Sequence, residues 1–305
     1  MLWKFLGGLS VLAMLVTMIA CSGGSGVQSA GKPTAVATIF AYFDALRSIG
    51  GEDINAVILL PQGTSPHEFS PTPRDKITVD GAQLIVKAGL GLDVWIDKLR
   101  ADNQTARVLD VGAGLEAIKT EEIALPGQSR EELEGAGNPH VWLDPQNQMK
   151  AADEIRDALI QIDPAHKDAY TQRAAAYRAD LNTLDGEFAA ATAGFKHKSF
   201  VGFHSAYAYL ARRYGLKQVA AIQEVGTGGM NVAQIQKVIE IIKADNVPVV
   251  FSETAFDAKQ ADVVIQATHV KLGTLQPLET YDDIQDTYVK LMRENLAQLT
   301  KAMAE

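Results

Sequence analysis

Three of the six histidines stand where an imidazole could bind a metal ion. His67 closes a loop rich in proline and glycine that follows an apolar run, and His204 ends the apolar run SFVGF. His140 lies between Pro139 and Pro145, whose fixed φ angles favour a stiff, extended segment. Ligands of open α/β sheets gather at the carboxyl ends of the strands, so His67 and His204 occupy favourable positions. Together the three positions indicate a shared site.

Neutral imidazole is a ligand that suits zinc, and three imidazoles leave one corner of a tetrahedral site to fill. Water at that corner would make a hydrolytic centre, whereas a carboxylate would close the site for binding alone. The sequence contains no His-Glu-x-x-His helix, no Gly-x-Ser-x-Gly elbow and no phosphate-binding loop. The absence of these signatures favours binding over catalysis.

The other three histidines are expected at the surface. His166 falls in the first turn of a predicted helix among polar neighbours, and His197 lies between two lysines. His269 falls near the end of a predicted helix, where the helix dipole mildly favours a cation. None of these settings indicates a shared function.

The elements that must position the site alternate between strand and helix. Apolar runs at 34–40 and 54–60 are typical of buried strands, and helical patterns separate them. After Gly194 the alternation begins again, with apolar runs at 199–203 and 247–252. Such alternation predicts parallel sheets covered by helices. We therefore expect an α/β fold of two similar lobes, with the metal site in the cleft between them.

One long bridging helix is predicted between the lobes. Pro164 suits its first position, and apolar residues recur at helical spacing from Tyr170 to about Ala193. Some thirty residues would span roughly 45 Å at about 1.5 Å per residue, which exceeds the width of one lobe. A closing helix is predicted at 284–303. The expected organisation is a first lobe at 33–162, a linker helix at 163–194 and a second lobe at 195–305.

The amino-terminal segment is typical of an exported lipoprotein. An early lysine precedes a short apolar run, Leu9 to Ile19, which is too short to span a membrane comfortably. The sequence Met-Ile-Ala-Cys that follows resembles a lipobox, which predicts a signal peptide at 1–20 and lipidation of Cys21. A Gly/Ser-rich, flexible tether completes residues 21–32. An ordinary cleaved signal with an incidental cysteine is the alternative. We expect an extracytoplasmic protein, anchored to a bacterial membrane in the periplasm or at the cell surface.

The composition of the chain bears on the number of domains, the kinds of partner and the redox compartment. A chain of 305 residues can form two domains, and a net charge of −9 argues against a nucleic-acid partner. Cys21 is the only cysteine, so the folded part has no disulfide and no free thiol, as suits an oxidising compartment. Residues 120–136 are rich in glutamate and are expected to form a mobile, solvated loop.

Four motifs occur in an order that resembles a known family. They are GTSPHEFSPTP at 63–73, NPHVWLDP at 138–145, FHSAYAYL at 203–210 and GTLQPLE at 273–279. With the signal and the long helix, they resemble the cluster A-I solute-binding lipoproteins, the extracytoplasmic zinc and manganese receptors of ABC importers. The similarity covers essentially the whole chain. Two departures from many family members are the lack of histidines in 120–136 and the lack of a disulfide in the second lobe.

The resemblance implies the ligands. Each of the first three motifs donates a histidine in the family, which maps onto His67, His140 and His204. The fourth ligand varies; here the sequence resembles the zinc members that use a glutamate, which is Glu279, while others leave that corner to water. His67 and His140 would come from the first lobe, and His204 and Glu279 from the second. Candidates for supporting residues around the ligands are Glu68, Trp142 and Glu253.

The resemblance also implies the function. We expect a monomeric, high-affinity zinc receptor, not an enzyme, that delivers Zn²⁺ to an ABC permease, with Mn²⁺ the less favoured metal. One alternative is a manganese or iron receptor of the same family. A second is an adhesin-like surface lipoprotein with a structural metal. A zinc hydrolase is the third, if water replaces Glu279.

Overall fold

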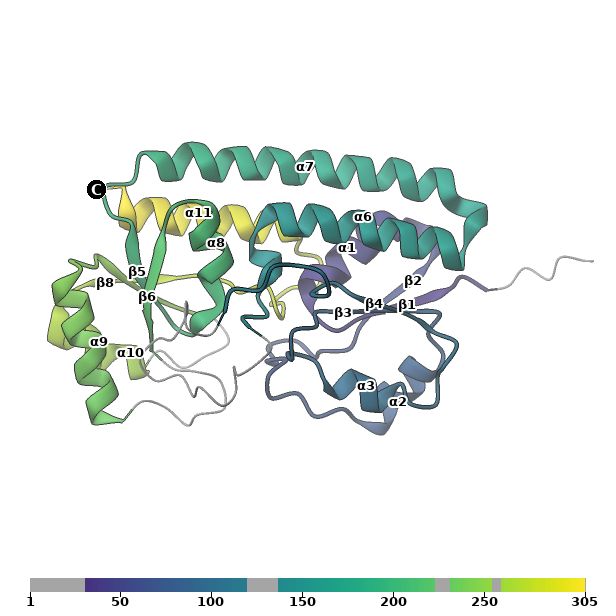
Figure 1. The fold of residues 1–305 in the computed structure, drawn as a ribbon, viewed down its shortest axis with the longest axis horizontal. Coiled ribbons are helices and arrows are strands. Elements are labelled where there is room, and N and C mark those ends of the chain that lie inside the picture. The colour runs from purple at the N-terminus through teal and green to yellow at the C-terminus, as the bar shows by residue number, and fades with distance from the viewer. Residues whose placement is uncertain (1–30, 120–136, 223–230, 254–258, 305) are drawn as a thin grey trace, which may run out of the picture. The chain divides into compact units, whose positions relative to one another are not determined.

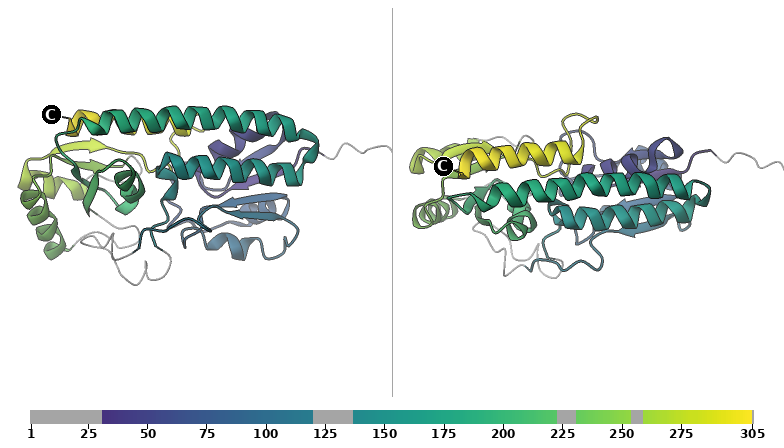
Figure 2. Two further views of the ribbon diagram at one scale, coloured as in Figure 1. Left: turned by 45° about the horizontal axis from the view of Figure 1, so that its top comes forward. Right: turned by 90° about the horizontal axis from the view of Figure 1, so that it is seen from above.

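Two four-stranded parallel sheets and a long helix that runs past both make up the fold, as Figures 1 and 2 show. The computed structural model describes residues 31–119, 137–222, 231–253 and 259–304. Lys32–Glu305 forms one compact unit. The prediction of two similar α/β lobes joined by one long helix is confirmed. The expected signal peptide, Cys21 and the acidic segment 120–136 lie outside the described residues.

The first sheet has the strand order β2-β1-β3-β4, with every neighbouring pair parallel. Alternate residues of its central strands face opposite cores, as the two-residue period of a strand requires. Ala35 and Ala37 pack toward α1 and α6, whereas Val36 packs toward α2 and α3. Both faces are therefore covered. The strands are β1 (Thr34–Ala37), β2 (Asn55–Ile58), β3 (Leu84–Lys87) and β4 (Arg107–Asp110).

The helices of the first lobe begin at residues suited to that role. α2 starts with a capping box in which Thr72 and Asp75 bond each other's backbone N–H, and Pro73 takes the first helical position. α6 follows Asp144, whose Oδ1 accepts a hydrogen bond of 2.9 Å from the backbone N–H of Gln146. The helices are α1 (Phe40–Gly50), α2 (Pro73–Asp80), α3 (Trp95–Leu99) and α6 (Pro145–Ile162).

The second sheet repeats the topology of the first, in the order β6-β5-β7-β8. Phe200 and Phe251 face the core shared with α7 and α11, while Val201 and Val250 face α9 and α10. The strands are β5 (Ser199–Gly202), β6 (Lys217–Ala221), β7 (Val249–Ser252) and β8 (Lys271–Thr274). The helices are α8 (Ala208–Arg213), α9 (Val232–Ala244), α10 (Lys259–Thr268) and α11 (Tyr288–Met303).

The bridging helix α7 (Lys167–Ala193) has 27 residues, or about 40 Å of length, and a 3₁₀ turn at Pro164–His166 precedes it. A buried stripe at alternating spacings of four and three residues faces α1, α6 and α11, and each fully buried large side chain stabilises the fold by about 1.5–3 kcal/mol. The stripe joins the cores of the two lobes. Its members are Tyr170, Ala174, Tyr177, Leu181, Leu184 and Phe188.

The closing helix begins later than the sequence pattern predicts, at Tyr288 instead of residue 284. Arg47 of α1 donates hydrogen bonds to the backbone carbonyls of Ile284 and Asp286, which are thereby held outside the helix. Thr287 then caps α11, because its Oγ1 accepts a bond of 3.2 Å from the N–H of Lys290. A tertiary contact therefore moves the helix start.

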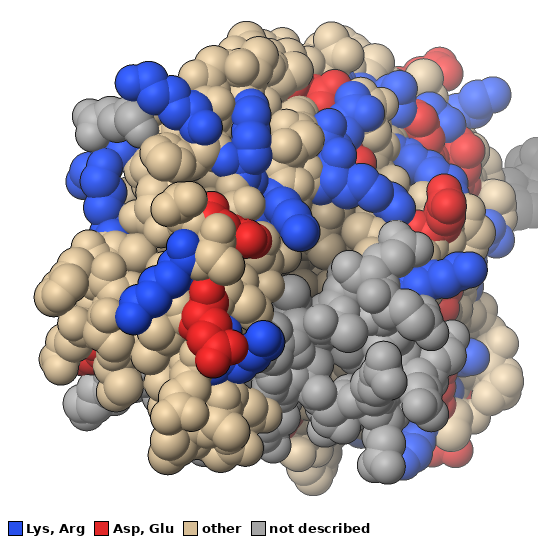
Figure 3. Space-filling model, turned by 60° about the vertical axis from the view of Figure 1, so that its left-hand side comes forward, with Lys and Arg blue, Asp and Glu red and all other residues tan. Residues whose placement is uncertain are grey.

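Charged side chains of both signs are scattered over the face shown in Figure 3, with lysine and arginine more frequent along its upper side. No helix in the described part of the chain has the length and apolar character needed to cross a membrane.

Candidate metal centre

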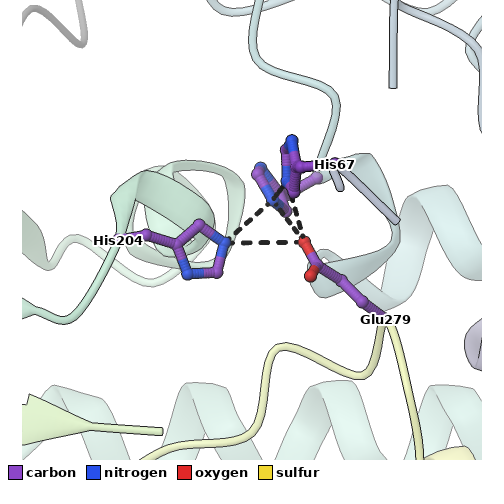
Figure 4. A group of neighbouring side chains, drawn as sticks. His67, His204 and Glu279 are labelled. Carbon is purple, nitrogen blue, oxygen red and sulfur yellow. Dashed lines mark hydrogen bonds and ion pairs between the residues drawn. The ribbon is translucent and has the colours of Figure 1, made fainter. Parts of the chain in front are cut away.

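His67, His140, His204 and Glu279 converge on one point, although they come from four separate segments of the chain. Figure 4 shows His67, His204 and Glu279 pointing toward it. One potential ligand atom from each residue lies within 4.8 Å of the other three. His67 follows β2 in a loop, His140 precedes the 3₁₀ turn Val141–Leu143, His204 follows β5, and Glu279 lies between β8 and α11. The structure therefore brings together all four of the residues that the sequence indicated as candidate ligands.

The spacing of these atoms fits a tetrahedral ion. Nε2 of His140 lies 3.1 Å from Nε2 of His204, 3.4 Å from Nε2 of His67 and 2.7 Å from Oε1 of Glu279. The same oxygen lies 3.3 Å from Nε2 of His67 and 3.5 Å from Nε2 of His204. Ligands about 2.0–2.1 Å from a tetrahedral zinc ion are separated from one another by about 3.3 Å. The cluster therefore needs only small adjustments to hold such an ion.

Hydrogen bonds at Nδ1 orient the two buried imidazoles. Nδ1 of His140 donates to Oδ1 of Asn138 at 2.9 Å, and Nδ1 of His204 donates to Oε1 of Glu253 at 2.8 Å. With the proton on Nδ1, each ring presents the lone pair of Nε2 to the centre of the cluster. Partners of this kind fix the tautomer and the ring orientation of metal-binding histidines.

Asn138 was not singled out from the sequence as a supporting residue. Its Oδ1 accepts from both the backbone N–H and Nδ1 of His140, each at 2.9 Å. Its Nδ2 donates to the carbonyl of Ser205 at 2.7 Å, next to His204. The signal was present in the Asn-Pro-His motif, because an asparagine commonly bonds the backbone two residues further along the chain.

The three supporting residues expected from the sequence have different surroundings. Glu253 is buried against His204, as described above. Trp142 is buried with its ring centroid 5.2 Å from that of His140, and its Nε1 donates to the carbonyl of Pro277 at 2.7 Å. Glu68 is exposed, and no hydrogen bond or ion pair joins its side chain to the cluster within the described ranges. The structure therefore does not place Glu68 in the site.

Burial and mutual charge shift the pKa values of the cluster. Burial lowers the pKa of His140 to about 4, and the attraction of Glu279 only partly opposes this effect. Burial also acts to lower the pKa of His204, but the carboxylates of Glu253 and Glu279 outweigh it and raise the pKa well above 6.5. Burial acts to raise the pKa of Glu279, yet the three imidazoles around its carboxylate hold that pKa well below its usual range. The cluster thus combines an ionised carboxylate with a neutral His140.

Access differs among the four residues. His140, His204 and Glu279 are buried, whereas the side chain of His67 keeps 25% of its surface exposed. His67 is therefore the one of the four that faces solvent.

The remaining histidines lie away from this cluster. His166 and His269 are exposed, and His197 is half-buried. Nδ1 of His166 bonds Oδ2 of Asp163 at 2.6 Å, which ties the start of α7 to the preceding turn. These positions agree with the expectation that the three residues lie at the surface.

Glu279 was expected to come from the second lobe, together with His204, but the structure places its segment differently. It follows β8 in the chain, but its carbonyl accepts a hydrogen bond of 2.8 Å from the backbone N–H of Phe40. The carbonyl of Leu278 accepts another, of 3.2 Å, from Ala41. Phe40 and Ala41 are the first two residues of α1, whose N–H groups have no partner within the helix. The segment that carries Glu279 therefore packs on the first lobe.

Comparisons with known proteins agree with this geometry. The family model described as "ZnuA: Zinc-uptake complex component A periplasmic" matches residues 35–302. The zinc-binding lipoprotein AdcA of Streptococcus pneumoniae is 30% identical over 295 residues, which are 92% of this chain and 58% of that protein. The chain thus spans little more than half the length of this relative. The manganese-binding lipoprotein MntA of Halalkalibacterium halodurans is 28% identical over 313 residues, covering 97% of this chain and 98% of that protein.

A solved structure is similar over most of the chain. The laminin-binding protein Lmb of Streptococcus agalactiae, described as a bifunctional protein with adhesin and metal-transporting activity, has 26% identity and a TM-score of 0.78. The superposition covers 88% of this chain and 99% of that one.

Proposed function

The chain belongs to the ZnuA family of metal-binding substrate-binding proteins, and from this premise we propose that it is a zinc receptor of an ABC importer. The observation that carries the proposal is the cluster of three imidazole nitrogens and one carboxylate oxygen, all within 4.8 Å of one another. Zinc is the transported substrate in this proposal. The receptor binds it outside the cytoplasmic membrane and delivers it to a permease.

The donor set supports zinc over manganese. Imidazole nitrogen suits zinc, whereas manganese prefers sites with more oxygen ligands. The cluster offers three nitrogens and one carboxylate, at separations that fit a tetrahedron. The alternative of a manganese or iron receptor is favoured by the name of the Halalkalibacterium halodurans relative, which is a manganese-binding lipoprotein.

We propose a receptor and not a hydrolase, because Glu279 fills the corner that a reactive water would need. Its Oε1 lies 2.7 Å from Nε2 of His140, and the residue is 2% exposed. A carboxylate in that position closes the coordination of a four-ligand zinc ion, which is typical of sites without catalytic function.

Lipidation of Cys21 and attachment to a bacterial membrane complete the proposal. The Streptococcus pneumoniae and Halalkalibacterium halodurans relatives are both named as lipoproteins. A flexible tether would let the folded body meet its permease while the lipid remains in the membrane. We propose that the receptor acts as a monomer, because one chain supplies all four ligands.

Elemental analysis of the purified protein, followed by competition between Zn²⁺ and Mn²⁺, tests the proposed function. We expect about one zinc ion per chain and displacement of Mn²⁺ by an equal concentration of Zn²⁺. A site that retains Mn²⁺ against equimolar Zn²⁺ would support the manganese receptor. A chain that binds neither metal would contradict the proposed function.

The description of the Streptococcus agalactiae protein as an adhesin and metal transporter favours one further candidate, an adhesin-like lipoprotein with a structural metal. A structural metal predicts that a chelator lowers the free energy of unfolding greatly and that the metal exchanges slowly. A transport receptor predicts a folded metal-free protein and exchange within minutes. Thermal unfolding with and without chelator distinguishes the two.

A further inference from the structure

We propose that His67, His140 and Glu279 form a preassembled three-ligand face on the first lobe, and that His204 closes the site from the second lobe. This inference rests on the proposed function, because it takes the four residues as ligands of the transported metal. The inference concerns the order in which the four residues bind the ion. It also identifies the residues that hold Glu279 in place.

The segment that carries Glu279 passes from one lobe to the other between Gln276 and Pro277. Before this point, the N–H of Leu275 donates to the carbonyl of Ser252 in β7 at 2.9 Å. Gln276 bonds Asn295 of α11 through its backbone N–H and carbonyl, each at 2.8 Å. After it, the carbonyl of Pro277 accepts from Nε1 of Trp142, in the first lobe, at 2.7 Å.

The next two residues are fixed to the amino-terminal end of α1. The N–H groups of Phe40 and Ala41 donate to the carbonyls of Glu279 and Leu278. Leu278 has a φ of 57°, in the left-handed region that a residue with a branched side chain rarely adopts, and it is buried. Such a conformation persists only where surrounding contacts enforce it. The contacts here come from the first lobe, so Glu279 is oriented by that lobe.

Asp44 and Arg47 of α1 position the part of the segment that follows Glu279. The buried carboxylate of Asp44 accepts from the N–H of Tyr288 at 3.0 Å and from Nη2 of Arg47 at 2.9 Å. Arg47 in turn donates to the carbonyls of Ile284 and Asp286. A charged group that bonds several partners at once holds a segment more firmly than isolated neutral bonds. The pair thus secures the far end of the segment that bears Glu279.

The loop that carries His67 is joined to the same segment. Nε2 of Gln62 donates to the carbonyl of Asp282, and Oγ1 of Thr280 donates to the carbonyl of Pro61 at 3.4 Å. The supports of His67 and Glu279 are therefore linked to each other without any contribution from the second sheet.

His204, by contrast, is held within the second lobe. Its Nδ1 bonds Glu253 at the end of β7, and its carbonyl accepts from Nε2 of Gln218 in β6 at 2.7 Å. Hydrogen bonds across the lobes lie close by, among them those from Asn138 to Ser205 and from Tyr209 to Asn138, each at 2.7 Å, and that from the N–H of Ile118 to Tyr209 at 3.0 Å. A displacement of the second lobe would break those bonds and withdraw His204 with Glu253, while the other three ligands stay together.

Zinc titration of alanine variants tests the order of assembly. We expect His204→Ala to weaken binding roughly tenfold to a hundredfold and still bind Co²⁺ with the spectrum of a site that has gained a water. Glu279→Ala and His140→Ala should each weaken binding at least tenfold more than His204→Ala does. If the wild type binds zinc but His204→Ala binds it more weakly than Glu279→Ala and His140→Ala do, this inference is overturned. The proposed function then remains intact. A wild type without zinc binding would instead contradict the proposed function.

Hydrogen exchange of the metal-free protein tests the positioning role of Arg47. In Arg47→Gln we expect exchange at 277–287 to rise at least tenfold and zinc affinity to fall about tenfold, with exchange in α7 unchanged. Arg293→Gln is the matched control, because Arg293 forms a paired contact with Glu187 on the surface, at 2.8 and 2.9 Å, away from this segment. If Arg47→Gln does not fold, Gln62→Ala removes a milder contact and should raise exchange around Asp282. Unchanged exchange and unchanged affinity in whichever variant folds would overturn the assignment.

Discussion

Oε1 of Glu253 lies 2.8 Å from Nδ1 of His204, and both side chains are buried. The two residues follow neighbouring parallel strands of the second sheet, β7 and β5 respectively. The bond directs Nε2 of His204 toward His140 and Glu279, so an acidic residue outside the candidate ligands determines how one imidazole faces the centre of the cluster.

Glu253→Gln should weaken zinc binding by about tenfold to a hundredfold, the usual effect of removing a charged partner of a metal-binding histidine. The amide keeps the shape of the side chain but loses the negative charge that favours the Nδ1 proton. Competition with a zinc-binding dye measures the change. Glu68→Gln, next to His67 but exposed, is the matched control and should leave the affinity unchanged. Equal affinities of the two variants would show that Glu253 has no such role.

His140→Ala should abolish most zinc binding, with an affinity loss of at least about a hundredfold, because Nε2 of His140 lies within 3.4 Å of the other three ligand atoms. The metal-free variant should remain folded, at a cost of about 1–3 kcal/mol for the lost buried side chain. Calorimetric titration and thermal unfolding in chelator give the two quantities. His269→Ala, an exposed histidine, serves as the control. An unchanged zinc isotherm would remove His140 from the site.

Zinc affinity should fall as the pH is lowered, and the fall should begin well above pH 6.5. The pKa of His204 is raised well above that value, so a proton occupies the metal-free cluster at neutral pH and zinc must displace it. Affinity then falls about tenfold for each unit of pH below the raised pKa. Titration calorimetry in buffers of different ionisation enthalpy should detect about one proton released per zinc bound. Release of no proton at pH 7 would contradict the shift.

The stability of the metal-free protein should show two opposite trends. His204 has a raised pKa, so its contribution is fully present below about pH 6.5 and is lost as the pH rises through the raised value. His140 has a lowered pKa of about 4, so stability falls as the pH drops from about 6.5 toward 4. Denaturant unfolding in chelator across this range measures both trends. In His140→Ala, stability should fall less between about pH 6.5 and pH 4 than it does in the wild type. An unchanged fall would show that His140 does not cause it.

Leu184→Ala should reduce the free energy of unfolding by about 2–5 kcal/mol, because Leu184 is fully buried on the face of α7 that joins the two lobes. Zinc affinity of the folded variant should change little, since no ligand lies on α7. Urea unfolding and zinc titration test the two parts. Asn182→Ala, exposed on the same helix, is the control and should stay within about 0.5 kcal/mol of the wild type. A large loss of zinc affinity in Leu184→Ala would show that α7 positions the site directly.

The sequence predicted the repeated architecture because its signals are local. Apolar runs separated by helical patterns indicate parallel strands, and the strand order of the two sheets is the same. His67 and His204 were found because each follows a strand, at the edge of a parallel sheet where ligands gather. His140 was found because two prolines surround it. The fourth corner, Glu279, came only from the resemblance to a family, since nothing in its local sequence marks a ligand.

The tertiary structure decided what depends on contacts between distant residues. The start of α11 moved to Tyr288 because Arg47, more than 230 residues earlier in the chain, bonds the carbonyls of Ile284 and Asp286. Glu253 became a partner of the His204 imidazole only where the chain folds back on itself, since 49 residues separate the two.

The sequence by itself determined that two parallel α/β halves would present histidines at the ends of their strands, because strand and helix periodicity act within a few residues. Only the tertiary structure decided that Glu279 packs on the first lobe, because the N–H groups at the start of α1 need partners and find the carbonyls of its segment. Tertiary packing also set the opposite pKa shifts of the two buried histidines. Burial lowers the pKa of His140, whereas the carboxylates of Glu253 and Glu279 outweigh burial and raise the pKa of His204, and the linear sequence does not contain the distances that decide this.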